Sequence, residues 1–144
     1  MNRKITPVIW SIFFVIMLSA SCTVNKSTTG KDYSARYVSH PNSMAEIKLE
    51  LEENLRFEYF MVILPEHGSE QKMDTLIFKG RWDAENGQYV LTFHRRKKPD
   101  LYALLDSEYF PTTNIIICDE RRVSFPLNAH EISIWGILCF REDD

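Results

Sequence analysis

The segment AEIKLELEENLRFEYFMVIL, residues 45–64, decides the fold class. Apolar and charged residues alternate in its first half, and the alternation resumes after a polar break at residues 52–54. Alternation at period two is typical of strands with one face toward water. A polar break between two such runs predicts a hairpin. The apolar positions are Ile47, Leu49 and Leu51 before the break and Phe57, Tyr59, Met61 and Ile63 after it.

The same pattern continues on both sides of this hairpin. DTLIFKGRW (74–82) and QYVLTFH (88–94) flank the segment DAENG, in which Asn86-Gly87 is a strong hairpin-turn signal. Roughly eight short strands at hairpin spacing predict an all-β fold, an antiparallel up-and-down meander closed into a lipocalin-like barrel, with a β-sandwich as the alternative. The remaining expected strands are residues 31–38, 114–120, 122–127 and 131–140.

Residues 95–113 do not follow the strand pattern. They fit either a distorted strand or a short helical turn at the barrel mouth. In the helical interpretation, Asp100 caps the turn, and Leu101, Leu104 and Leu105 face inward. Both interpretations remain open at this point.

The N-terminus has the layout of a secretory signal peptide. Arg3 and Lys4 precede an almost wholly apolar run of sixteen residues, 5–20. A transmembrane helix needs about 20 apolar residues, so this run is too short to span a bilayer. A basic start, a short apolar middle and a small-residue end predict a cleaved signal peptide at residues 1–21.

The end of this run, Leu18-Ser19-Ala20-Ser21-Cys22, resembles a bacterial lipobox, although Ser19 occupies the position where leucine is usual. The resemblance implies that Cys22 is acylated on sulfur and becomes the new N-terminus. Plain secretion after an ordinary signal-peptidase cut before Cys22 is the alternative. Residues 22–30 are small and polar, which predicts a flexible tether between the lipidated cysteine and a domain at residues 31–144.

The domain resembles the small lipocalin-like lipoproteins of the bacterial envelope. The residues that carry the resemblance are Tyr33, Leu49, Leu51, Phe57, Tyr59, Gly80, Trp82, Tyr89, Leu91 and Phe93. It implies a lipid anchor in the cell envelope, and the tether lacks the acidic run of surface-exported lipoproteins, which favours an outer-membrane protein facing the periplasm. The copper- and stress-related branch of that group carries a Cys-x-x-Cys motif that this chain lacks, so no copper or redox role is implied.

Charge and cysteine content narrow the function classes. The chain has 17 basic and 20 acidic residues, and loss of Arg3 and Lys4 with the signal leaves 15 and 20. A mildly acidic domain disfavours nucleic-acid binding. Cys118 and Cys139 lie in apolar strand-like runs, and they form either a disulfide or two buried thiols.

Two tryptophans have packing interpretations. Trp82 faces inward, and Gly80 is expected to leave room for its indole. Trp135 is on the opposite parity from its apolar neighbours, so it either lies on the outer surface as a partner contact or caps a barrel end.

No catalytic motif is recognisable. The histidines at 40, 67, 94 and 130 have no metal-ligand spacing, and no Gly-x-Ser-x-Gly elbow exists. A hydrolase therefore has no residue evidence, and the sequence predicts no enzyme, cofactor or metal. The basic cluster Arg95, Arg96, Lys97 and Lys98 is expected in an exposed hairpin loop, either simply solvated or in contact with anionic lipid headgroups.

These observations predict a membrane-anchored envelope lipoprotein whose non-catalytic β domain binds a protein or another envelope component. The alternative is a carrier that holds a small apolar ligand inside its barrel. Large aromatic residues on the inward parity argue for a filled interior, because an eight-stranded barrel holds either its own side chains or one small ligand.

Overall fold

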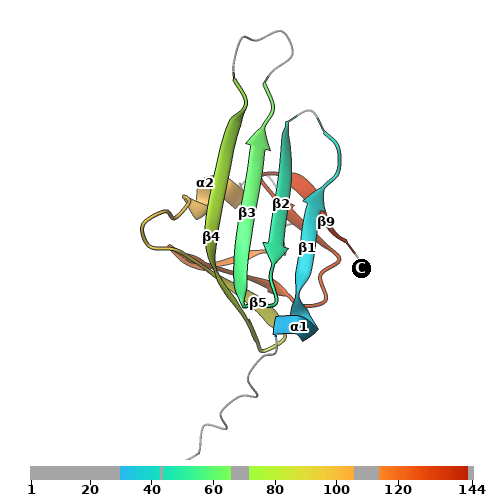
Figure 1. The fold of residues 1–144 in the computed structure, drawn as a ribbon, viewed down its shortest axis with the longest axis vertical. Helices are drawn as coiled ribbons and strands as arrows, with labels where there is room; N and C mark the ends of the chain where they lie inside the picture. Colours follow the sequence, from blue (N-terminus) through green and yellow to red (C-terminus); the bar gives the residue numbers. More distant parts are fainter. Residues whose placement is uncertain (1–29, 43, 66–71, 106–113, 143–144) are drawn as a thin grey trace, which may run out of the picture.

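A computed structural model describes residues 30–42, 44–65, 72–105 and 114–142 (Figure 1). The predicted signal peptide, Cys22 and most of the tether lie outside the described residues. The helices are α1 (Gly30–Tyr33) and α2 (Leu101–Leu105). The strands are β1 (Ala35–Ser39), β2 (Ala45–Leu51), β3 (Arg56–Ile63), β4 (Asp74–Glu85), β5 (Gln88–Phe93), β6 (Ile116–Asp119), β7 (Arg122–Pro126), β8 (Glu131–Ile134) and β9 (Ile137–Glu142).

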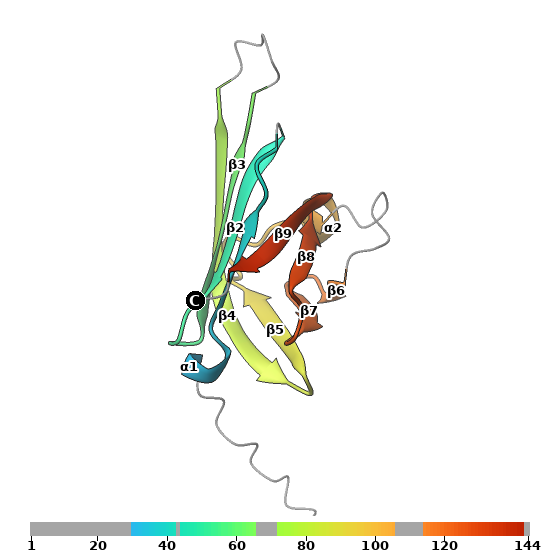
Figure 2. The same cartoon turned by 90° about the vertical axis from the view of Figure 1, so that its right-hand side faces the viewer.

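All strand pairs are antiparallel, and they form one nine-stranded sheet of order β6-β7-β5-β4-β3-β2-β1-β9-β8. The sheet curls into a half-barrel (Figures 1 and 2). The all-β antiparallel prediction is therefore confirmed. Strands β1 to β5 form the expected meander, but the chain then departs from it, because β7 rather than β6 pairs with β5. The side-chain amide of Asn114, just before edge strand β6, donates a 2.9 Å hydrogen bond to the Glu131 carbonyl of edge strand β8.

Two predicted strands differ in the structure. Residues 131–140 form two strands, because Trp135 and Gly136 have φ values of 52° and 71° and make a tight turn. Such left-handed pairs suit the twist of a two-residue hairpin. Near the N-terminal end, residues 30–33 form one helical turn, so the first strand begins only at Ala35.

The hairpins of residues 45–64 and 74–94 form as predicted. In the first, Leu49 pairs with Tyr59 and Leu51 pairs with Phe57, which places the apolar sets of β2 and β3 on one face. In the second, Asn86 and Gly87 take the positive φ values of 52° and 77° that the turn requires.

Aromatic side chains fill the concave side of the sheet. Tyr37 and Phe125 are fully buried and meet edge to face with centroids 5.6 Å apart, and Tyr89 lies 5.1 Å from the same Phe125 ring. Both phenols have carbonyl partners at 2.8 Å, Ala129 for Tyr37 and Tyr33 for Tyr89. Burial raises the pKa of Tyr37 to about 12, so this hydroxyl stays a neutral donor.

Trp82 is a core residue, with 2% of its surface exposed. Its indole N–H donates a 3.0 Å hydrogen bond to the carbonyl of Glu52 in the β2–β3 turn. The expected role of Gly80 is wrong in detail. A Cβ on Gly80 would lie 2.5 Å from Cε1 of Phe57 and would overlap the carbonyl oxygen of Thr92. Gly80 therefore makes room for the Phe57 ring and the neighbouring backbone rather than for the indole.

The helical interpretation of residues 100–105 is confirmed. The Asp100 carboxylate accepts hydrogen bonds from the backbone N–H of Tyr102 and Ala103, at 3.1 and 3.3 Å. This is an N-cap arrangement. The three leucines of α2 are buried, as expected, and they cover one end of the half-barrel.

Candidate functional site

An apolar groove opens at the rim of the half-barrel. It lies between the end of β3, the start of β4, helix α2 and the β8–β9 turn. We call it the rim groove, and its volume is about 260 Å³. It is lined by Met61, Ile63, Leu76, Phe78, Pro99, Asp100, Ala103, Leu104 and Trp135.

Strand register builds one wall of the rim groove. Met61 pairs with Leu76, and Tyr59 pairs with Phe78, so these side chains project from the same face of the sheet. Helix α2 supplies the opposite wall. Of the residues that line the groove only Asp100 is charged, and its carboxylate caps α2. The rim groove therefore offers contact to apolar groups and little hydrogen bonding.

Trp135 completes this wall from the β8–β9 turn. A left-handed conformation costs a residue with a side chain about 1–2 kcal/mol. The indole is half-buried, packs against the core and lines the groove. Trp135 therefore packs against the core instead of lying free on the outer surface, and its contact with a partner stays a prediction.

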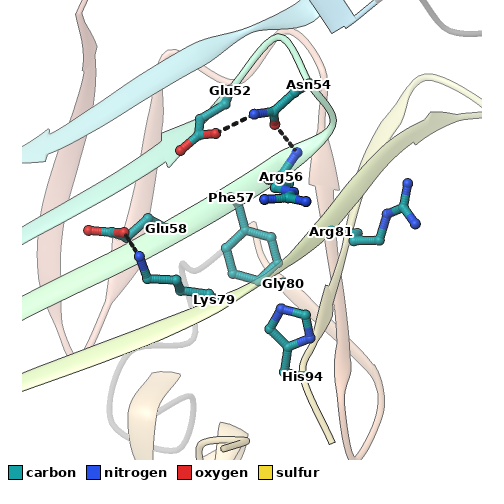
Figure 3. Close-up of a pocket in the computed structure, with 9 residues that line it drawn as sticks. All are labelled: Glu52, Asn54, Arg56, Phe57, Glu58, Lys79, Gly80, Arg81 and His94. Atoms are coloured by element: carbon teal, nitrogen blue, oxygen red, sulfur yellow. Dashed lines mark hydrogen bonds and ion pairs between the residues drawn. The ribbon is translucent and has the colours of Figure 1, made fainter.

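A second, polar groove lies near the β2–β3 turn, and we call it the arginine groove (Figure 3). Its volume is about 770 Å³. Two of its acidic residues are engaged: Glu58 forms an ion pair with Lys79, and a Glu52 carboxylate oxygen accepts a 2.8 Å hydrogen bond from the Asn54 amide. It is lined by Glu52, Asn54, Arg56, Phe57, Glu58, Lys79, Gly80, Arg81 and His94.

The basic cluster at residues 95–98 is exposed, as expected, but it is not a hairpin loop. It connects β5 to α2, because the next strand along the chain does not pair with β5. Lys98 forms a 2.6 Å ion pair with Glu120, and this contact lowers the pKa of the Glu120 carboxyl. Contact of Arg95, Arg96, Lys97 and Lys98 with lipid headgroups stays a prediction.

Cys118 and Cys139 are both free, so the disulfide interpretation is wrong. The alternative of two buried thiols holds only for Cys139, because Cys118 is exposed on edge strand β6. Burial raises the pKa of the Cys139 thiol to about 12.

The histidines do not come together with other metal-binding side chains in the part of the chain that the structure describes. His40, His94 and His130 are exposed, and His67 lies outside that part. No group of three or more His, Cys, Asp or Glu side chains in the described ranges could hold a metal ion.

Comparison of the chain with protein-family models, curated proteins and solved structures found no significant match. Among the described residues, no helix is both long and apolar enough to cross a membrane.

Sequence reasoning missed both grooves. A signal for the rim groove was present, since β3 becomes apolar on both faces after Tyr59 and Trp135 breaks the parity of its segment. The arginine groove had no such signal, because Arg56 and Arg81 meet only through the β3–β4 register.

Proposed function

We propose that this protein is a membrane-anchored envelope lipoprotein whose non-catalytic β domain binds a protein partner through the rim groove. The anchor is the acylated Cys22, supported by the lipobox-like end of the apolar N-terminal run. Two or more acyl chains hold a protein stably at a bilayer, whereas one does so only marginally.

The size and lining of the rim groove carry the proposal. Pockets for small molecules usually measure about 300–1,000 Å³ and contain several polar groups that fix the ligand. The rim groove measures about 260 Å³ and has one charged lining residue, which is already used as a helix cap. These properties suit an apolar anchor side chain of a partner protein better than a carried ligand.

The surroundings of the groove extend the apolar surface. Met73 is 66% exposed and directly precedes β4, whose first residue pairs with the groove residue Ile63. Met44 is 51% exposed, and its carbonyl accepts a hydrogen bond from the backbone of Leu64 at the same end. Exposed methionines adapt to varied apolar partners.

The lining of the groove comes from the end of β3, the start of β4 and α2, and these parts lie away from α1 (Figures 1 and 2). A domain held through the chain that precedes α1 presents the rim groove away from the membrane, where a periplasmic or envelope protein can reach it.

Photo-crosslinking in cells tests this proposal. A photoreactive amino acid placed at Ala103, an exposed residue that lines the groove, should yield a discrete protein adduct. The same group at Tyr102 is the matched control, because Tyr102 is 70% exposed on the same helix but does not line the groove.

A second variant checks that the crosslinked partner occupies the rim groove. Ala103→Asp should abolish the adduct formed from a photoreactive group at Met73, since it places a charge in an apolar site. Equal adducts from positions 102 and 103 would contradict the proposal. Native mass spectrometry that shows a stoichiometric small apolar molecule in the groove would favour the carrier alternative instead.

A further inference from the structure

Two arginines face each other across β3 and β4 in the arginine groove. Arg56 is the direct cross-strand partner of Arg81. Like charges directly opposite each other destabilise a sheet. Within the described residues neither guanidinium has a carboxylate partner within ion-pair distance. Among these residues, therefore, no carboxylate is paired directly with either arginine to offset their repulsion.

The two carboxylates that line the groove have other partners, and neither forms an ion pair with Arg56 or Arg81. Glu58 is engaged with Lys79, and Glu52 is engaged with Asn54. Both arginines line the groove, and Figure 3 shows the Arg56 guanidinium near the Phe57 ring, with the Arg81 side chain extending from the neighbouring strand.

His94 adds a further ring to the lining of this hollow, and its backbone N–H donates a 3.1 Å hydrogen bond to the Lys79 carbonyl. That bond fixes the start of the basic cluster next to β4. Guanidinium groups bind phosphate oxygens through paired N–H donors, so two arginines side by side suit a phosphate group.

The position of the groove indicates where the phosphate comes from. Gly30 packs so closely on the β2–β3 turn that a Cβ there would overlap the Glu53 carbonyl oxygen. Arg56 follows this turn directly, and the backbone N–H of Trp82, next to Arg81, donates to the Leu55 carbonyl at 3.0 Å. The chain thus enters the domain beside the arginine pair.

The length of chain before Gly30 limits the distance to the anchor. The eight residues from Cys22 to residue 29 span at most about 29 Å. If Cys22 holds the protein at a bilayer, the arginine pair lies at the membrane-proximal end. We infer that the arginine groove binds the phosphate group of an anionic lipid headgroup in the membrane that holds the anchor. This inference rests on the proposed anchoring.

Acidic residues at this end of the domain limit phosphate binding to the arginine pair. Asp32 and Glu53 are exposed near the chain entry, so the end as a whole is not strongly positive. Binding should therefore depend on Arg56 and Arg81 specifically, and not on any equal number of basic residues elsewhere.

The test uses the mature full-length protein held by its lipid in nanodiscs, and the backbone N–H signals of Phe57 and Gly80 report on the groove. The first arm titrates inorganic phosphate in phosphatidylcholine discs. The second compares discs of phosphatidylcholine with discs that also contain phosphatidylglycerol, both with a paramagnetic label at the headgroup level. The variants are R56S/R81S and, with the same loss of charge outside the groove and the basic cluster, K31S/K72S.

Phosphate should shift both signals saturably in wild type and in K31S/K72S, but not in R56S/R81S. Paramagnetic broadening should be several-fold greater in anionic discs and should weaken between 0.1 and 1 M salt, as the Debye length falls from about 10 to about 3 Å. Loss of both arginines should lower the equilibrium constant for headgroup binding about 30-fold, because each basic residue contributes roughly a factor of five at an anionic surface.

Equal behaviour of the two variants, or no phosphate shift in wild type, would overturn the inference. Phosphate binding with the same broadening in both kinds of disc would overturn the headgroup assignment and leave a site for soluble phosphate. If the purified protein carries no lipid at Cys22, the proposed anchoring fails, and the same phosphate titration of the protein in solution still decides whether the site exists.

Discussion

At the scale of single residues, Trp82 connects the core to the β2–β3 turn. The ring lies 5.7 Å from Tyr89 in an edge-to-face contact, while its N–H reaches the Glu52 carbonyl. The alternation of residues 74–82 was enough to predict that this side chain faces inward. The hydrogen bond was not predictable, because it depends on the backbone of a turn in which Leu55 has a φ of 62°.

Replacing Trp82 by alanine should lower the free energy of unfolding by about 3–5 kcal/mol, since it removes a large buried ring and leaves the Glu52 carbonyl unpaired. Urea unfolding followed by circular dichroism measures the change. Trp82→Phe is the control and should lose less, because it keeps an aromatic ring in the core. An unfolding midpoint for Trp82→Ala equal to that of wild type would show that this interpretation of the core is wrong.

Gly80 and the cysteines show where residue-scale reasoning stops. A glycine inside a strand pattern indicated a close approach, but the identity of the approaching group, Phe57, follows from the β3–β4 register. Cys118 and Cys139 lie in similar apolar runs, yet one is on an edge strand and the other is on a strand paired on both sides. The order of strands in the sheet determines which cysteine is exposed, and the local sequence pattern does not reveal that order.

At the scale of elements, α2 depends on its surroundings. A helix of five residues is too short to be stable alone in water. Its Asp100 cap and its inward leucines were predictable from spacing, which is why the helical alternative could be stated from sequence. Its role as a wall of the rim groove was not, because the opposite wall comes from β3 and β4 and the third side from Trp135.

Leu105→Ala should lower the free energy of unfolding by about 2–4 kcal/mol, because this buried leucine holds α2 on the core. Tyr102→Ala, on the exposed side of the same helix, should change it by less than about 0.5 kcal/mol. Thermal or urea unfolding of the two variants in parallel provides the measurement. Similar losses in both would indicate that α2 is not held by its leucines.

The two final strands illustrate another limit at this scale. Residues 131–140 alternate well enough to suggest one strand, and no Asn-Gly signal interrupts them. The turn occurs at Trp135-Gly136, where glycine tolerates the left-handed conformation and tryptophan does not favour it. Packing of the Trp135 indole against the core opposes the conformational cost of the left-handed backbone. That packing exists only in the assembled half-barrel.

At the scale of the whole molecule, the half-barrel carries two grooves of different chemistry, one polar and one apolar. The chain enters beside the arginine groove, and the parts that line the rim groove lie away from α1 (Figures 1 and 2). Fold class, hairpins and core aromatics were predictable because they follow from period-two patterns and turn residues. The separation of the β6–β7 and β8–β9 hairpins to opposite edges was not, since it depends on long-range pairing of β7 with β5 and of β9 with β1.

The roles proposed for the rim groove and the arginine groove both require that Cys22 holds the protein at a membrane. The mass of the N-terminal peptide of the membrane-extracted protein is the most direct test. We predict a peptide that begins at Cys22 and carries acyl chains, and we predict that Cys22→Ala blocks processing or releases the domain from membranes. An unmodified N-terminus at Cys22, or a chain that retains Met1, would contradict the account.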